Sequence, residues 1–141
     1  MKNYTNSIPQ YLKIRVGGII GPAYSIRMKD NELLYRVYEE ENDDDYREIV
    51  INPTDQEWQA FKQTLDEIGV WNWQDEYPNP DQNENAPWFV EIKWGNRKIK
   101  SFGESNYPIV DGDPENKADI SPTFERFLEA VRKLIGGLKF R

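Results

Sequence analysis

The sequence predicts an α+β protein in which an antiparallel meander sheet packs on two helices, in the order ββββ-α-ββ-α. Four short segments with period-two alternation come first, and two segments with helical apolar spacing follow, with a further strand pair between them. Strands and helices do not alternate as βαβ units, which disfavours a parallel doubly wound sheet. A chain of 141 residues has the size of one domain, so we predict a single domain over residues 1–141, with residues 1–9 as a flexible N-terminal tail.

The first four predicted strands are joined by turns that carry recognisable turn residues. They span residues 11–16, 24–28, 33–38 and 46–51. A glycine-rich bend at 17–22 separates the first two strands. Residues 29–32 predict a hairpin loop because Asp and Asn tolerate positive φ. Residues 39–45 contain no apolar side chain and predict an acidic loop.

The first helix is predicted near residues 54–68. Thr54 and Glu57 have the spacing of a capping box, which predicts the start of the helix. Gly69 stands where a left-handed residue commonly ends a helix. One apolar face is formed by Trp58, Phe61, Leu65 and Ile68.

The second half predicts a long loop, a hairpin and a last helix. The loop spans residues 74–87, and the hairpin strands at 88–94 and 97–102 flank a Gly-Asn turn. The helix near 122–135 begins with Ser121 as its N-cap and a proline at its first position, and two glycines stop it. We expect the tail after it to pair with the sheet.

The chain contains no histidine and no cysteine. This composition removes the usual proton-transfer side chain, the thiolate nucleophile and the two main zinc ligands. Asp43–Asp45 are adjacent and should point apart, which favours a solvated loop over a cation site. The glycine-rich segment at 16–21 lacks the spacing of a phosphate-binding loop. We therefore predict no cofactor and no metal.

The absence of cysteine and of any long apolar stretch also bears on location and on partners. We expect a cytoplasmic protein with no membrane partner. The net charge of -7 is uneven: residues 41–91 carry -12, whereas residues 1–40 carry +2 and residues 92–141 carry +3. An acidic middle disfavours nucleic-acid binding and favours a basic protein partner. The alternative is an acidic face that is merely solvated.

The aromatic residues give the positive signal for a site. Trp71, Trp73 and Tyr77 flank or enter the 74–87 loop, beside acidic residues. Trp and Tyr are enriched at interaction hot spots, although core packing is the common role of Trp. The candidate binding residues are Trp71, Trp73, Tyr77, Asp43, Asp44, Asp45, Asp75 and Glu76.

A resemblance covers residues 55–135. The motifs are Ile68-Gly69-Val70-Trp71-Asn72-Trp73, Tyr77, Trp88-x-Val90-x-Ile92, Gly103 and Asn106-Tyr107-Pro108. In these motifs the chain resembles a group of small uncharacterised bacterial proteins with a helix followed by a tryptophan pair, a tryptophan-led hairpin and a Tyr-Pro turn before a C-terminal helix. The resemblance implies no activity and no catalytic residue.

These observations predict a non-enzymatic binding or interaction protein that uses an acidic, aromatic-bordered surface, for example an inhibitor or immunity-type protein for a basic partner. The alternative is a carbohydrate-binding or carboxylate-pair glycoside-hydrolysing domain. Trp71, Trp73 and Tyr77 would then stack on sugar rings, near acids such as Asp75, Glu76 and Glu91. Homodimerisation through an edge strand is a further hypothesis for the partner.

Overall fold

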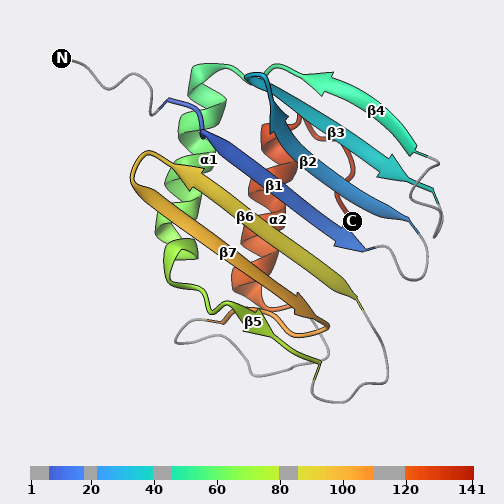
Figure 1. Cartoon of the computed structure of the whole chain (residues 1–141), viewed down its shortest axis with the longest axis vertical. Helices are drawn as coiled ribbons and strands as arrows, with labels where there is room; N and C mark the ends of the chain where they lie inside the picture. Colours follow the sequence, from blue (N-terminus) through green and yellow to red (C-terminus); the bar gives the residue numbers. More distant parts are fainter. Residues whose placement is uncertain (1–6, 18–21, 40–45, 80–85, 110–119) are drawn as a thin grey trace.

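The computed structural model describes residues 7–17, 22–39, 46–79, 86–109 and 120–141. It has two layers, a seven-stranded sheet and two helices that lie together behind one face of that sheet (Figure 1). The strands are β1 (Tyr11–Gly17), β2 (Ala23–Lys29), β3 (Glu32–Tyr38), β4 (Tyr46–Ile51), β5 (Glu76–Tyr77), β6 (Pro87–Trp94) and β7 (Arg97–Glu104), in the spatial order β4-β3-β2-β1-β6-β7-β5. The helices are α1 (Asp55–Glu67), the short 3-10 helix η2 (Val70–Asn72) and α2 (Pro122–Leu134). The predicted α+β class and element order are confirmed, with one strand added.

The added strand, β5, lies inside the segment predicted as a loop over 74–87. It pairs in parallel with β7, whereas every other strand pair is antiparallel. A two-residue strand is too short to show alternation in sequence. Its position is set by bonds from β7: the Phe102 backbone N–H donates to the Asp75 carbonyl over 3.1 Å, and the Ser101 hydroxyl donates to the Gln74 carbonyl.

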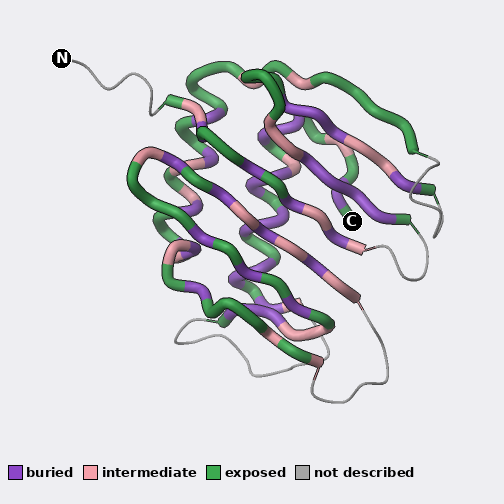
Figure 2. The backbone as a smooth tube through the Cα atoms, in the orientation of Figure 1, coloured by how far each residue is buried: buried purple, intermediate pink, exposed green. Residues whose placement is uncertain are grey.

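Strand β1 joins the two halves of the sheet. It pairs with β2 on one side and with β6 on the other, and Ile14 lies opposite both Ile26 and Val90. These three side chains are fully buried because period-two alternation turns them toward the helices. The burial pattern in Figure 2 shows the same alternation along the central strands. The core therefore lies between the helices and one face of the sheet.

The predicted turn at 29–32 and the predicted helix caps are confirmed, whereas most of the predicted bend at 17–22 and of the predicted loop at 39–45 lies outside the described residues. Asp30 and Asn31 adopt positive φ angles of 53° and 66° in the β2–β3 turn. At the start of α1, the Glu57 backbone N–H donates to the Thr54 hydroxyl, and the Thr54 N–H donates to the Glu57 carboxylate. Gly69 ends that helix with φ of 68°. In each case local sequence and final fold agree, which is the condition for a unique native state.

The C-terminal tail docks by its side chains and does not join the sheet as a strand. Phe140 is fully buried and its ring centroid lies 6.2 Å from that of Tyr24. The Tyr35 hydroxyl donates to the Lys139 carbonyl over 2.6 Å. The aromatic anchor overrides the expected strand pairing because burying a Phe side chain contributes more than a few exposed ladder bonds.

Part of the predicted N-terminal tail packs against the core. Of the predicted N-terminal tail, residues 1–6 lie outside the described residues, Ile8 packs partly against the core and Pro9 is buried.

Within the described residues, neither helix combines the length and the apolarity that a bilayer crossing requires.

Candidate functional site

The candidate site lies on the face of the sheet that the helices leave uncovered. Side chains alternate along each strand, so the neighbours of the buried core residues point to this open face. Tyr11 on β1 is 41% exposed, and the ring of Phe102 on β7 is 42% exposed. The open face therefore combines charged side chains with aromatic ones.

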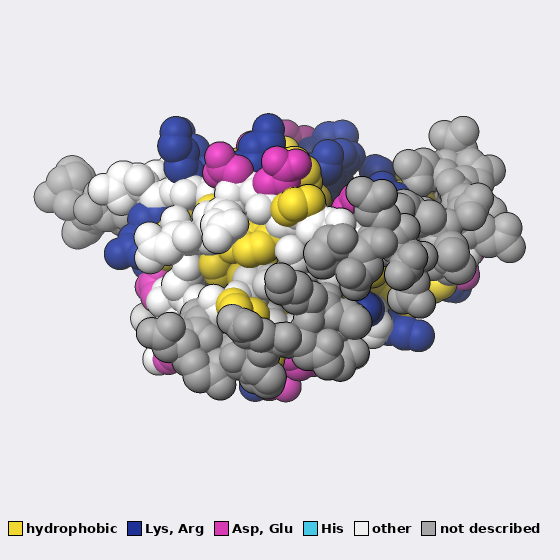
Figure 3. Space-filling model, turned by 90° about the horizontal axis from the view of Figure 1, so that it is seen from below, with side chains coloured by type: hydrophobic (Ala, Val, Ile, Leu, Met, Phe, Trp, Pro, Cys, Tyr) yellow, Lys and Arg dark blue, Asp and Glu magenta, His cyan; other side chains and the backbone are white. Residues whose placement is uncertain are grey.

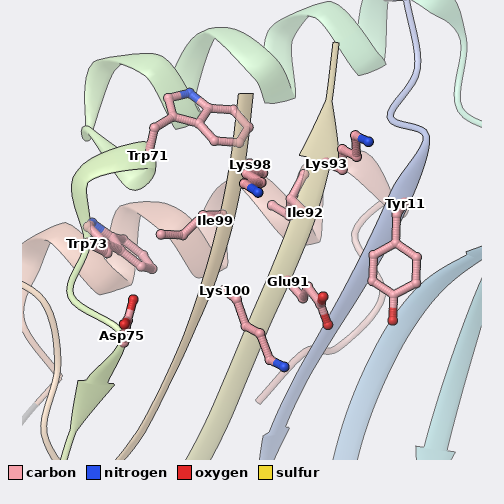
Figure 4. A pocket seen from close by; sticks show the side chains of 10 residues that line it. All are labelled: Tyr11, Trp71, Trp73, Asp75, Glu91, Ile92, Lys93, Lys98, Ile99 and Lys100. Atoms are coloured by element: carbon pink, nitrogen blue, oxygen red, sulfur yellow. The ribbon is translucent and has the colours of Figure 1, made fainter. Parts of the chain in front are cut away.

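A hollow of about 550 Å³ opens on this face over β6 and β7. Its volume lies within the range of small-ligand sites. Ten residues line it: Tyr11, Trp71, Trp73, Asp75, Glu91, Ile92, Lys93, Lys98, Ile99 and Lys100. Figure 4 shows Tyr11 and Trp71 on opposite sides of the hollow, with the lysines and Glu91 between them.

Strand register brings the charged lining residues together. Lys93 lies directly opposite Lys98, and Glu91 lies directly opposite Lys100. On its other side Glu91 lies opposite Lys13 of β1. Each of these residues occupies an outward position of its strand, so the sheet itself presents them to solvent as a rigid row.

Trp71 is fixed at the border of the hollow by α1. Its indole Nε1 donates to the Asp66 carboxylate over 2.7 Å. Asp66 also lies 3.7 Å from Arg97 and 3.8 Å from Lys62. This network holds the half-buried ring in one orientation, so Trp71 borders the hollow as a preorganised wall.

Trp73 belongs mainly to the core. It is 8% exposed, and its ring lies 5.4 Å from Phe127 and 6.0 Å from Trp88, both edge to face. Its buried Nε1 has no hydrogen-bond partner among the described residues. An unpaired buried donor costs about 1–3 kcal/mol. Packing against the aromatic cluster offsets this cost.

Tyr77 is half-buried and also packs inward, with its ring centroid 5.6 Å from that of Trp88. Its hydroxyl accepts a hydrogen bond of 2.9 Å from the Gln74 backbone N–H. Burial raises the pKa of Tyr77, and the bond from Gln74 opposes part of that rise. Trp71, Trp73 and Tyr77 therefore do not form one flat platform facing solvent.

The predicted acidic residues separate into three groups. Asp75 lines the hollow and is exposed, and Glu76 is exposed on β5 outside the lining. Asp43–Asp45 lie outside the described residues. The structure thus brings Trp71, Trp73 and Asp75 to one hollow, whose lining includes neither Glu76 nor Tyr77.

Glu91 was named only for the carbohydrate alternative, and six further lining residues were not among the predicted candidates: Tyr11, Ile92, Lys93, Lys98, Ile99 and Lys100. The signal that could have found the charged ones was present, because the predicted strands at 11–16, 88–94 and 97–102 already placed them on outward positions. What was missing was the pairing of β1 with β6, which brings Tyr11 next to Lys93.

The charges of the hollow are not neutralised pairwise. Lys93, Lys98, Lys100, Asp75 and Glu91 form no ion pair within the part of the chain that the structure describes. No group of three or more Asp or Glu residues that could hold a metal ion occurs among the described residues. The site therefore offers separate hydrogen-bonding charges and an aromatic border.

Comparison with known proteins adds no family and no activity. No protein-family model matches the chain, and no curated protein matches its sequence.

Proposed function

We propose that this chain is a non-enzymatic binding protein whose site is the open face of the sheet at the hollow beside Trp71 and Asp75. The observation that carries the proposal is the hollow itself, lined by five charged side chains without ion pairs among the described residues. Charged groups that are not used within a fold are available to a partner. The rigid sheet underneath supplies preorganisation, which lowers the entropy cost of binding.

The absence of histidine and cysteine supports binding over turnover. The remaining chemistry would require carboxylate pairs, and a general acid of this kind needs an apolar, closed surrounding. Asp75 is exposed, and Glu91 lies between two lysines across the strands. Such surroundings suit carboxylates that accept hydrogen bonds from a ligand.

A paired pull-down from lysate of the source organism tests this proposal. The bait variants are wild type, the open-face double variant Tyr11→Ser/Lys100→Ser, and the matched control Glu129→Ala/Lys133→Ala. The control removes an exposed ion pair of 3.4 Å on α2, away from the open face. We expect a protein retained by wild type and control to be lost from the open-face variant. A partner retained equally by all three would overturn the proposal.

The acidic docking of a basic partner remains a separate prediction. It depends on Asp43–Asp45, outside the described residues, together with the exposed Glu76. Reversal of the three aspartates to lysine should then weaken capture of a basic protein, and unchanged capture would contradict it. The expected cytoplasmic location likewise stays part of this proposal, supported by the cysteine-free composition.

A carbohydrate site is the second candidate function. Its support is that two carboxylates, Asp75 and Glu91, share the hollow with two partly exposed rings, Tyr11 and Trp71. Sugar sites combine aromatic faces with polar groups of this kind. Glycan binding that is lost in Tyr11→Ala would support this candidate. Hydrolysis of a glycoside that is lost in Asp75→Asn or Glu91→Gln would extend it to catalysis and contradict the non-enzymatic proposal.

A further inference from the structure

The open face carries a second hollow, and Tyr11 lies between the two. The second hollow has a volume of about 270 Å³, and its charged lining consists of Lys13, Arg27 and Lys29. Tyr11 lines both hollows. Together the two hollows carry six cationic side chains and two carboxylates. A chain of net charge -7 thus presents a basic strip across β2, β1, β6 and β7. Figure 3 shows Lys and Arg side chains along the upper margin of the molecule, with Asp and Glu side chains among them.

Like charges face each other within this strip. Lys13 lies directly opposite Arg27, and Lys93 lies directly opposite Lys98. Directly opposed like charges destabilise a sheet. The Nε atom of Arg27 is buried and has no hydrogen-bond partner among the described residues. The strip therefore carries an electrostatic cost that an anionic ligand would relieve.

Elsewhere on the open face, a cation is neutralised by an ion pair with a carboxylate. On β3, Arg36 lies opposite Glu48 of β4 and forms an ion pair of 2.6 Å with it. The six cations of the strip form no such pair with any described residue, although Lys13 lies 5.7 Å from the ring centroid of Phe89. The contrast locates the unneutralised charge on the four strands of the strip.

The strip is short and is bounded by acids. It spans three strand spacings, about 14 Å at the usual distance of 4.7–4.9 Å between neighbouring strands. On the side of β7 and β5 it ends at Glu104 and Glu76, and on the side of β3 and β4 it ends at the neutralised Arg36–Glu48 pair. A long polyanion such as a nucleic acid would run onto these carboxylates. A segment of a few residues would fit within the strip.

The two carboxylates inside the strip favour a peptide over a phosphate chain. Asp75 and Glu91 accept hydrogen bonds and repel anions. A peptide backbone offers N–H donors to such acceptors between its acidic side chains, whereas the sugar-phosphate backbone of DNA has no hydrogen-bond donor. The mixture of six cations with two acceptors thus matches an extended acidic peptide.

We propose that the basic strip binds a short acidic segment of a partner protein, with its carboxylates at the lysines and arginine of the two hollows and its backbone beside Tyr11. This inference rests on the proposed function and specifies the chemistry of the partner. Complementary fields of this kind chiefly raise the association rate and make binding sensitive to salt.

Fluorescence anisotropy with the full chain tests the proposal. The probe is a labelled five-residue peptide of alternating Glu and Ser, about 16 Å long when extended, and the control probe replaces Glu by Gln. The test variant is Lys93→Gln/Lys98→Gln, and the matched variant Lys133→Gln removes one exposed charge on α2. We expect the Glu peptide alone to bind, with affinity about tenfold lower in the double variant and unchanged in Lys133→Gln.

A second readout separates binding from misfolding. Lys98→Gln removes the repulsion with Lys93, so it should raise the urea midpoint while it lowers peptide affinity. Three results would each overturn the acidic-segment proposal. They are equal binding of the Gln peptide, no binding of the Glu peptide, and tighter binding of a labelled ten-nucleotide oligothymidine. If the pull-down still shows partner loss in Tyr11→Ser/Lys100→Ser, the proposed function stands and only the acidic chemistry is wrong.

Discussion

Gly103 lies so close to Trp88 that a β-carbon at this glycine would stand 2.6 Å from the indole nitrogen Nε1. The same nitrogen donates a hydrogen bond of 2.8 Å to the Asn106 carbonyl. The Asn106 amide in turn donates to the Pro78 carbonyl over 3.0 Å. This contact joins β6, β7 and the segment after β5, at the end of the molecule where hydrophobic atoms gather in the centre of Figure 3. The absence of a side chain at Gly103 is thus a packing requirement.

Gly103→Ala should destabilise the protein by about 1–3 kcal/mol, because the added methyl displaces the Trp88 indole or its hydrogen bond. Urea unfolding followed by tryptophan fluorescence measures the change. Glu104→Ala, at the next and exposed position of β7, is the matched control and should stay within about 0.5 kcal/mol of wild type. Equal stabilities for the two variants would show that the indole moves aside without cost.

Phe140→Ala should cost about 3–5 kcal/mol, because it removes a fully buried ring from the contact with Tyr24. Lys139→Ala is the control, since its side chain is exposed and only its carbonyl bonds to Tyr35. Thermal unfolding should separate the two variants clearly. A small effect of Phe140→Ala would mean that the tail is dispensable for the core.

Alkaline pH should destabilise the protein through its tyrosines. Burial raises the pKa of Tyr35 and of Tyr77 above the ordinary value of 10.0. The unfolded chain therefore loses these protons at lower pH than the folded one. The stability contribution is complete below about pH 10 and is lost as pH rises through the folded pKa values.

Urea unfolding at several pH values up to 11, with tyrosinate absorbance as a second signal, measures this loss. Tyr77→Phe keeps the ring against Trp88 and should make the alkaline decline shallower. An unchanged slope in that variant would assign the decline to other groups.

Strand β4 is the longer of the two edge strands of the sheet, and we expect it to support self-association. Tyr46, Ile49 and Val50 are 41%, 47% and 45% exposed there. An edge with unpaired backbone groups and apolar side chains is a template for a second strand. Light scattering after size-exclusion chromatography should show a mass that rises with concentration, and Ile49→Lys should abolish the rise. A wild-type mass that stays monomeric at every concentration would remove the homodimer hypothesis.

Local signals predicted most of the fold because each depends on residues near in sequence. The capping box at Thr54 and the positive-φ turn at Asp30 needed no knowledge of the tertiary structure. Strand β5 could not be predicted because its pairing is imposed by β7. The burial of Phe140 could not be predicted because an aromatic residue in a four-residue tail shows no periodicity.

The candidate site was predicted only in part for a related reason. Trp71 and Asp75 were found from composition along one segment, and both line the hollow. Tyr11 lies far away in sequence and reaches the hollow only through the β1–β6 register. Trp73 also lines the hollow, but its ring is only 8% exposed and belongs mainly to the core, which is the common role of Trp. The sequence shows which side chains are present, and strand pairing determines which of them lie together in a site.

The seam between β1 and β6 has a consequence for the route by which the chain reaches this structure. The hairpins of β1–β4 and the β6–β7 hairpin can each close over short loops, whereas joining Ile14 to Val90 requires the ends of a very long loop to meet. Such nonlocal pairing slows folding. Until that step is complete, both facing edges and their apolar residues stay exposed, so the half-assembled sheet is the species most prone to aggregate.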